Sequence, residues 1–258
     1  MNNNIHCEVV ESGICVISLN SKPINALSFD FLNSLKSTFL RIQDDKSIRV
    51  VILKSNLKNF SAGADLKERK IMSKNDASNA LDNFNDCFNV IDNLSKPTIC
   101  LINGYCLGGG AELALAFDFR IGANDSIIGF PEVGIGIIPG AGGTYRLPKI
   151  IGQANAKYWI YTAKKFNADE SLKYGFLNFS VPNEDTMNVA LDLSNEIIKN
   201  APIAVMSAKK AINESYSKEL NTGLAIERKN YSVTLNTKDR DEALDAFLSK
   251  RKPVWKNE

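Results

Sequence analysis

Three consecutive glycines at residues 108–110 constrain the fold of this 258-residue chain more than any other sequence feature. They follow a short apolar segment at residues 97–102 and lead into a helix that we predict over residues 109–116. Glycine is costly at such a position unless the backbone must be strained or exposed. Glu112 falls in the first turn of this helix, among N–H groups that lack helical partners. The simpler alternative is a carboxylate stabilised by the helix dipole.

Strand and helix patterns alternate along most of the chain, which predicts an α/β core. From about residue 201 the pattern changes to successive helices, so we divide the chain into a core at residues 1–200 and a helical region at residues 201–258. The predicted strands are residues 7–19, 49–54, 97–102 and 119–123, and the predicted helices are residues 28–43, 76–94, 109–116, 205–216, 220–235 and 240–251.

A second turn of small residues, SAGADLK at residues 61–67, directly follows the strand at residues 49–54. Small residues let the backbone approach a ligand, and a helix beginning near Asp65 would present free N–H groups to it. A plain strand-to-helix turn is the alternative.

Glu132 lies in an almost uncharged stretch, residues 126–144. Burial there would raise the pKa of its carboxyl group, so that it could donate a proton near neutral pH. A glutamate in a surface turn is the alternative. Two backbone N–H groups can hold a thioester oxygen that gains charge, and two carboxyl groups can hold a water between them. Together these residues suit the addition of water to an enoyl thioester.

Several other chemistries are disfavoured. The only histidine, His6, lies close to the N-terminus, which argues against hydrolases with a histidine base and against histidine zinc sites. The five cysteines form no C-x-x-C pair, so we expect reduced thiols and no bound metal. A net charge of +2 gives no reason to expect bulk attraction to nucleic acid or membranes.

Four segments resemble the enoyl-CoA hydratase/isomerase (crotonase) family, and the resemblance covers residues 15–256. They read SAGADLKER, NGYCLGGGAELALAFD, GFPEVGIGIIPGAGGTYRLP and TKDRDEALDAFLSKRKP. GADLKER, TGLAIE and TKDR look most like the 3-methylglutaconyl-CoA hydratase branch. The resemblance implies a spiral of ββα turns with a C-terminal helical trimerisation region.

The same resemblance implies roles for individual residues. Glu112 would position and deprotonate the water, and Glu132 would deliver the proton to Cα. The backbone N–H groups of Ala64 and Gly109 would form the oxyanion hole. The substrate-binding residues would be Asp65, Leu66 and Lys67 along the CoA channel, and Phe247 and Lys250 at the adenine end, on a neighbouring subunit.

The expected activity is hydration of an enoyl-CoA, either 3-methylglutaconyl-CoA in leucine degradation or a short-chain enoyl-CoA of fatty acid metabolism. The alternatives are a Δ3,Δ2-enoyl-CoA isomerase and a non-catalytic homologue that binds a CoA ester or RNA. We expect no cofactor, because coenzyme A is part of the substrate, and a homohexamer built as a dimer of trimers. The expected location is cytoplasmic, or the mitochondrial matrix if a targeting segment has been removed.

Three residues or segments bear on specificity. Phe130 stands where some short-chain hydratases have Gln, so a hydrogen bond to a catalytic Glu would be missing. Arg69 follows the first turn, and its guanidinium could pair with the distal carboxylate of methylglutaconyl-CoA. One relative in that branch binds RNA through a lysine-rich helix. Here the corresponding helix, residues 27–42, carries only Lys36 and Arg41 as bases, so we expect no specific RNA binding.

Overall fold

The computed structural model describes residues 4–11 and 13–258, without the side chains of Glu11 and Leu66. Its centre is a six-stranded sheet in the order β1-β2-β3-β4-β6-β9, in which β1 runs antiparallel to β2 and the other neighbours are parallel. A second, three-stranded sheet has the order β5-β7-β8. The strands are β1 (Ile5–Glu11), β2 (Ile14–Leu19), β3 (Val50–Ser55), β4 (Thr98–Ile102), β5 (Tyr105–Leu107), β6 (Phe119–Ala123), β7 (Ile127–Gly129), β8 (Lys165–Asn167) and β9 (Phe179–Val181).

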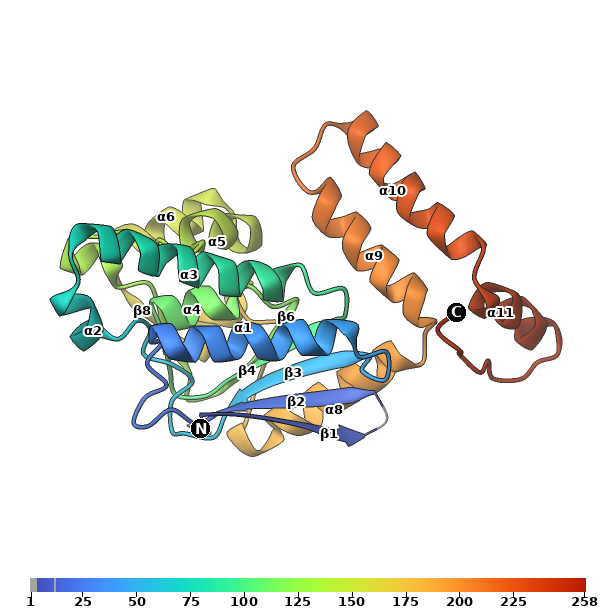
Figure 1. Cartoon of the computed structure of the whole chain (residues 1–258), viewed down its shortest axis with the longest axis horizontal. Helices are drawn as coiled ribbons and strands as arrows, with labels where there is room; N and C mark the ends of the chain where they lie inside the picture. The colour runs from blue at the N-terminus through green and yellow to red at the C-terminus, as the bar shows by residue number, and fades with distance from the viewer. Residues whose placement is uncertain (1–3, 12) are drawn as a thin grey trace.

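Helices cover both faces of the large sheet (Figure 1). The helices are α1 (Phe29–Asp44), α2 (Leu66–Ile71), α3 (Lys74–Asp92), α4 (Gly109–Ala114), α5 (Gly143–Ile151), α6 (Gln153–Thr162), α7 (Ala168–Lys173), α8 (Thr186–Ile198), α9 (Pro202–Ser215), α10 (Leu220–Leu235) and α11 (Lys238–Leu248), with 3-10 turns η1 (Glu132–Ile135) and η2 (Asn183–Asp185).

Alternation along the strands divides the hydrophobic core in two. In β3, Val51 and Leu53 face the side that carries α1, α3 and α4, while Val50 and Ile52 face α8. Because both faces are covered, β3 is buried along most of its length, as the uninterrupted apolar run at residues 50–53 predicts.

The C-terminal helices stand apart from the sheets (Figure 1). Helices α9 and α10 pack against each other, and α11 lies at the far end of the molecule from α2 and α5. Pro202 starts α9 three residues before the predicted start, because proline suits the first turn of a helix. Helix α11 ends at Leu248, earlier than predicted, and Lys250 follows it with φ +54°.

The prediction of helix boundaries was poorest in the middle of the chain. Helices α5 to α8 were not predicted at all, and α4 ends at Ala114 rather than at residue 116. Within the part of the chain that the structure describes, no helix is long and apolar enough to cross a membrane.

Candidate active site

The turn at residues 61–65 is held between two neighbouring segments. Ser61 forms an isolated parallel bridge with Cys106, and Ala64 forms one with Leu27. Asp65 caps α2, because its side chain accepts hydrogen bonds from the N–H groups of Lys67 (2.9 Å) and Glu68 (3.3 Å). The predicted helix start near Asp65 is therefore confirmed. The Asp65 carboxylate serves the helix end, where it satisfies two N–H groups that would otherwise lack partners.

The two glycine-bearing turns touch each other through their backbones. Gly63 has φ +92°, and a Cβ placed on it would lie 2.8 Å from the carbonyl oxygen of Leu107 and 3.0 Å from the nitrogen of Gly109. A Cβ on Gly109 would lie 3.4 Å from the nitrogen of Ala64. Only glycine permits this approach at residue 63, since any side chain would separate the turns.

The N–H groups of Ala64 and Gly109 are consequently neighbours. Within residues 4–11 and 13–258, neither group donates a hydrogen bond to another protein atom. Gly109 is also the first residue of α4, where the helix leaves its first N–H groups unpaired. Two adjacent, unpaired N–H groups are the arrangement that binds a carbonyl oxygen as it becomes an oxyanion.

Glu112 lies on α4, one turn into the helix, and its side chain is buried. One carboxylate oxygen, Oε1, accepts hydrogen bonds from the N–H groups of Ala141 and Gly143, both at 2.8 Å. Burial raises the pKa of Glu112 to about 7; the two N–H donors oppose this rise, and the nearby Glu132 adds to it. The carboxyl group is thus fixed in place and can take up or release a proton near neutral pH.

Glu132 begins the η1 turn, and its side chain is also buried. Within the described residues its Oε2 atom has no hydrogen-bond partner, and burial raises the pKa of its carboxyl group. Its other oxygen would lie 3.1 Å from a Cβ on Gly108, whose φ is +54°. Glu132 therefore reaches the backbone immediately before Gly109, beside the unpaired N–H groups.

The loop that donates to Glu112 is held in place by hydrogen bonds from Arg146, a residue that was not predicted to belong to the site. Its buried guanidinium donates to the Ala141 carbonyl (3.3 Å), to Asp92 (3.0 Å) and to Asn89 (2.8 Å). These bonds tie the start of α5 to α3. The sequence does contain one signal for this residue: Arg146 closely follows the glycines of the segment GAGGTYR. An arginine that becomes buried there needs several hydrogen-bond acceptors.

Phe130 is fully buried and packs against Trp159 and Phe176, with ring centroids 6.4 and 6.5 Å apart. Its ring belongs to an aromatic cluster that includes Trp159 of α6, Phe166 of β8 and Phe176. The side chain offers no hydrogen bond to either glutamate, which agrees with the unpartnered oxygen of Glu132.

The remaining predicted binding residues lie in different surroundings. The guanidinium of Arg69 lies 5.5 Å from the ring centroid of Phe84, and that ring reaches within 3.1 Å of the Cβ position of Gly109. Lys67 is exposed, and the side chain of Leu66 lies outside the described residues. Phe247, on α11, is 82% exposed. Within one chain, neither Phe247 nor Lys250 is brought to the two glutamates, because α11 lies at the far end of the molecule (Figure 1).

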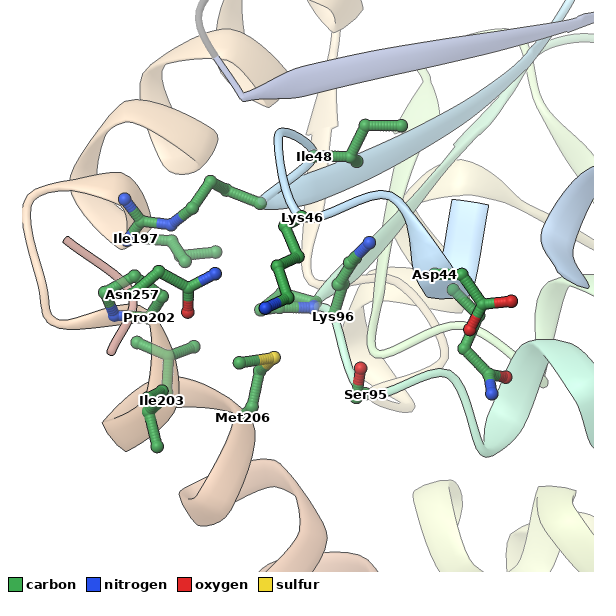
Figure 2. Close-up of a pocket in the computed structure, with 14 residues that line it drawn as sticks. Asp44, Lys46, Ile48, Ser95, Lys96, Ile197, Pro202, Ile203, Met206 and Asn257 are labelled. Atoms are coloured by element: carbon green, nitrogen blue, oxygen red, sulfur yellow. The ribbon is translucent and has the colours of Figure 1, made fainter. Parts of the chain in front are cut away.

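A cavity of about 370 Å³ lies elsewhere, where the core meets the helical region. Figure 2 shows Ile203 and Met206 of α9 on one side and Lys96 on the other. None of the predicted site residues lines it. The ammonium group of Lys96 already donates hydrogen bonds to the carbonyls of Ile42 and Asp45, so it stabilises the fold. Among the described residues, no group of three or more His, Cys, Asp or Glu could hold a metal ion.

Comparison with known proteins identifies the family. A family model described as enoyl-CoA hydratase/isomerase matches residues 9–258. The chain belongs to the enoyl-CoA hydratase/isomerase family. The crystal structure of an enoyl-CoA hydratase from Bacillus anthracis superposes with a TM-score of 0.96 at 40% identity, covering 99% of this chain and 100% of that one. The crotonase-type fold predicted from the sequence is therefore confirmed.

Curated relatives carry different substrate names. The short-chain-enoyl-CoA hydratase of Clostridium acetobutylicum is 38% identical over 97% of this chain and 96% of its own length. The mitochondrial methylglutaconyl-CoA hydratase of Homo sapiens is 39% identical over 98% of this chain and 76% of its own length. Because the two identities are nearly equal, membership of this family does not select between the two substrates.

Proposed function

We propose that this protein is a hydro-lyase that adds water reversibly across the α,β double bond of an enoyl-CoA thioester. The observation that carries the proposal is the meeting of two buried carboxyl groups, Glu112 and Glu132, beside the unpaired N–H groups of Ala64 and Gly109. Relatives named enoyl-CoA hydratase support it, including those of Arabidopsis thaliana and Clostridium acetobutylicum.

The proposed reaction starts with the thioester carbonyl oxygen bound to the N–H groups of Ala64 and Gly109. Glu112 takes a proton from a water held between the two carboxyl groups, and the hydroxide adds to Cβ. The electron pair of the double bond moves toward the carbonyl, where the two N–H groups stabilise the enolate. Glu132 then gives its proton to Cα. The product leaves Glu112 protonated and Glu132 ionised, so a proton must pass between them before the next cycle.

The raised pKa values of Glu112 and Glu132 support these roles as base and acid. A carboxyl group with its usual pKa would be ionised near pH 7 and could not act as an acid. Glu112 has a pKa of about 7 and two fixed N–H donors, which suits a base that returns to the same position each cycle. Glu132 has an oxygen without a protein partner, which leaves that oxygen free for water or substrate.

For the substrate, we propose an enoyl-CoA with a distal carboxylate, such as 3-methylglutaconyl-CoA. The guanidinium of Arg69 lies over the ring of Phe84, and a Cβ placed on Gly109 would lie 3.1 Å from that ring. A substrate carboxylate that reached past this ring could form a paired hydrogen bond with the guanidinium. A short-chain enoyl-CoA has no group for Arg69 to pair with and is the alternative.

The activity is tested with purified protein by following the absorbance of the conjugated enoyl thioester, which hydration lowers and which formation of a 2-enoyl-CoA from a 3-enoyl-CoA raises. Crotonyl-CoA, 3-methylglutaconyl-CoA and a 3-enoyl-CoA form the panel. Hydration of the first two supports the proposal. Conversion of only the 3-enoyl-CoA to a 2-enoyl-CoA would assign the isomerase activity instead, and binding without turnover of any of the three would indicate a non-catalytic protein.

The Arg69→Met variant tests the substrate. If Arg69 pairs with the distal carboxylate, the variant lowers kcat/KM for 3-methylglutaconyl-CoA by about 10- to 100-fold and leaves crotonyl-CoA unchanged, because a charge-assisted hydrogen bond is worth about 1.5–3 kcal/mol. Lys70→Met is the matched control, since Lys70 is the exposed neighbour on the same helix. An unchanged ratio of the two substrates in Arg69→Met would refute this role of Arg69 without affecting the hydratase assignment.

We further propose that the C-terminal helices assemble several chains, with Phe247 and Lys250 serving the site of a neighbour. Large apolar side chains on these helices are exposed in the single chain, among them Leu220 (75%), Phe247 (82%) and Leu248 (78%). Exposed apolar area of this kind marks an interface. Light scattering at several concentrations tests it: a hexamer or trimer is expected, and a monomer would refute it.

A further inference from the structure

Cys7 and Cys15 meet across the first hairpin of the sheet. Their Sγ atoms are 3.1 Å apart. In the antiparallel register Cys7 lies opposite Ile17, and Cys15 lies opposite Val9. The two cysteines are therefore diagonal neighbours on the same face of β1 and β2. β1 is the edge strand of the large sheet, so it is bonded to the sheet on one side only.

The two thiols differ sharply in access to solvent. Cys7 is exposed, whereas Cys15 is completely buried. The hydrogen bond from Cys15 lowers the pKa of Cys7 to about 7, and Arg41 and His6 add to this effect. The same hydrogen bond and burial raise the pKa of Cys15. One thiol of the pair is thus open to attack an external reagent, and the other lies directly behind it.

The other cysteines have no such arrangement. Cys87, Cys100 and Cys106 are buried, and burial raises the pKa of each thiol. A thiolate is the species that reacts with disulfides. These three cysteines are therefore protected by their burial and by their raised pKa, which keeps them as thiols. They serve as internal controls in the same molecule.

We propose that Cys7 and Cys15 form a reversible redox site, which closes to an intramolecular disulfide by exchange with a small disulfide such as oxidised glutathione. The Cys7 thiolate attacks one sulfur of the reagent, and the first glutathione thiolate leaves. The Cys15 thiol then loses its proton and attacks Sγ of Cys7, and the second glutathione leaves. The two cysteines lose two electrons and two protons in total, and the reagent becomes two reduced thiols.

Neither cysteine belongs to the proposed catalytic site. The site glutamates lie on α4 and η1, whereas this pair joins the edge strand to β2. The redox site is therefore independent of the hydratase proposal, and it predicts a chemical change in a chain whose cysteine spacing alone suggested only reduced thiols.

The test equilibrates the full chain with glutathione buffers that range from reduced to oxidised, followed by acid quenching, unfolding and alkylation. In oxidising buffer we expect a mass loss of two hydrogens and a peptide that links Cys7 to Cys15, with the other three cysteines alkylated. Reducing buffer should restore five alkylated cysteines. Five alkylated cysteines at every ratio, or a disulfide between any other pair, would overturn the proposal.

Two variants separate the steps of the exchange. Cys15→Ala should retain one glutathione on Cys7, because the second attack is removed. Cys7→Ser should take up no glutathione, because Cys15 is buried. A stable glutathione adduct on wild-type Cys7, equal in amount to that of Cys15→Ala, would show that Cys15 does not attack and would refute the site. Circular dichroism confirms folding of each variant. Should Cys15→Ala fail to fold, the wild-type peptide map alone decides.

Discussion

The two glutamates of the candidate site are both buried, yet the protein holds them very differently. Glu112 is fixed through one oxygen by the N–H groups of Ala141 and Gly143, and Arg146 fastens that loop from behind. Glu132 has an oxygen with no partner in the described part of the chain. A buried polar atom without a partner costs free energy, so its retention indicates a role outside folding. The comparison indicates one carboxyl group whose position is fixed and one left open for substrate or water.

The largest effect is expected from removing either carboxyl group. Glu112→Gln and Glu132→Gln should each lower kcat by about 10²- to 10⁴-fold, because each loses a group that transfers a proton. KM should change little, since the thioester oxygen is bound by backbone N–H groups. Steady-state kinetics with the preferred enoyl-CoA provide the measurement. Full activity in either variant would remove that glutamate from the mechanism.

A smaller effect is expected from displacing Glu132 without removing it. In Gly108→Ala the new Cβ would lie 3.1 Å from the Glu132 carboxylate, at a residue with φ +54°. Misplacement of a catalytic group by about 1 Å can cost about 100-fold in rate, so kcat should fall by about that factor. Gly134→Ala is the control, because its Cβ meets only Ala163, at 3.7 Å. Equal kcat values for the two variants would show that the position of Glu132 does not matter.

Glu112 should also make the folded chain less stable at neutral pH than at acidic pH. The pKa of Glu112 is about 7 in the folded chain and near 4.5 when unfolded, so the folded state binds more protons between these values. The binding of this proton stabilises the folded state. The stabilisation is complete below about pH 4.5 and is lost as pH rises through about 7. Glu112→Gln keeps the acceptor for both N–H groups and removes the charge.

Glu112→Gln should therefore be more stable than the wild type by up to about 3 kcal/mol above pH 8, and by little below about pH 5. Urea unfolding of both proteins at several pH values measures the difference. A variant that is less stable than the wild type at high pH would contradict the buried, proton-binding environment assigned to Glu112.

Local signals in the sequence predicted the parts of the site that are formed by neighbouring residues. The glycines at residues 108–110 predicted a strained or exposed backbone, and the structure shows a positive φ of +54° at Gly108. The apolar surroundings of Glu132 predicted its burial. Each of these features depends on a few consecutive residues, so sequence patterns were sufficient.

Features that depend on distant residues were not predictable in this way. The donors to Glu112 lie about thirty residues further along the chain, and no pattern in the sequence pairs them. Helices α5 and α6 are bounded by Gly142 and Gly152 and include Pro148, which interrupt the helical periodicity. Helix α8, in contrast, carries apolar residues at helical spacing, among them Met187, Ala190 and Ile197. This helix was therefore predictable from the periodicity of its apolar residues.

The most direct test of the account is the kcat of the double variant Glu112→Gln/Glu132→Gln, measured beside both single variants. If the two carboxyl groups act on one water, the second substitution adds little, and the double variant is about as slow as the slower single variant. If the two losses multiply, the glutamates act independently, and the shared water at the centre of this account is wrong.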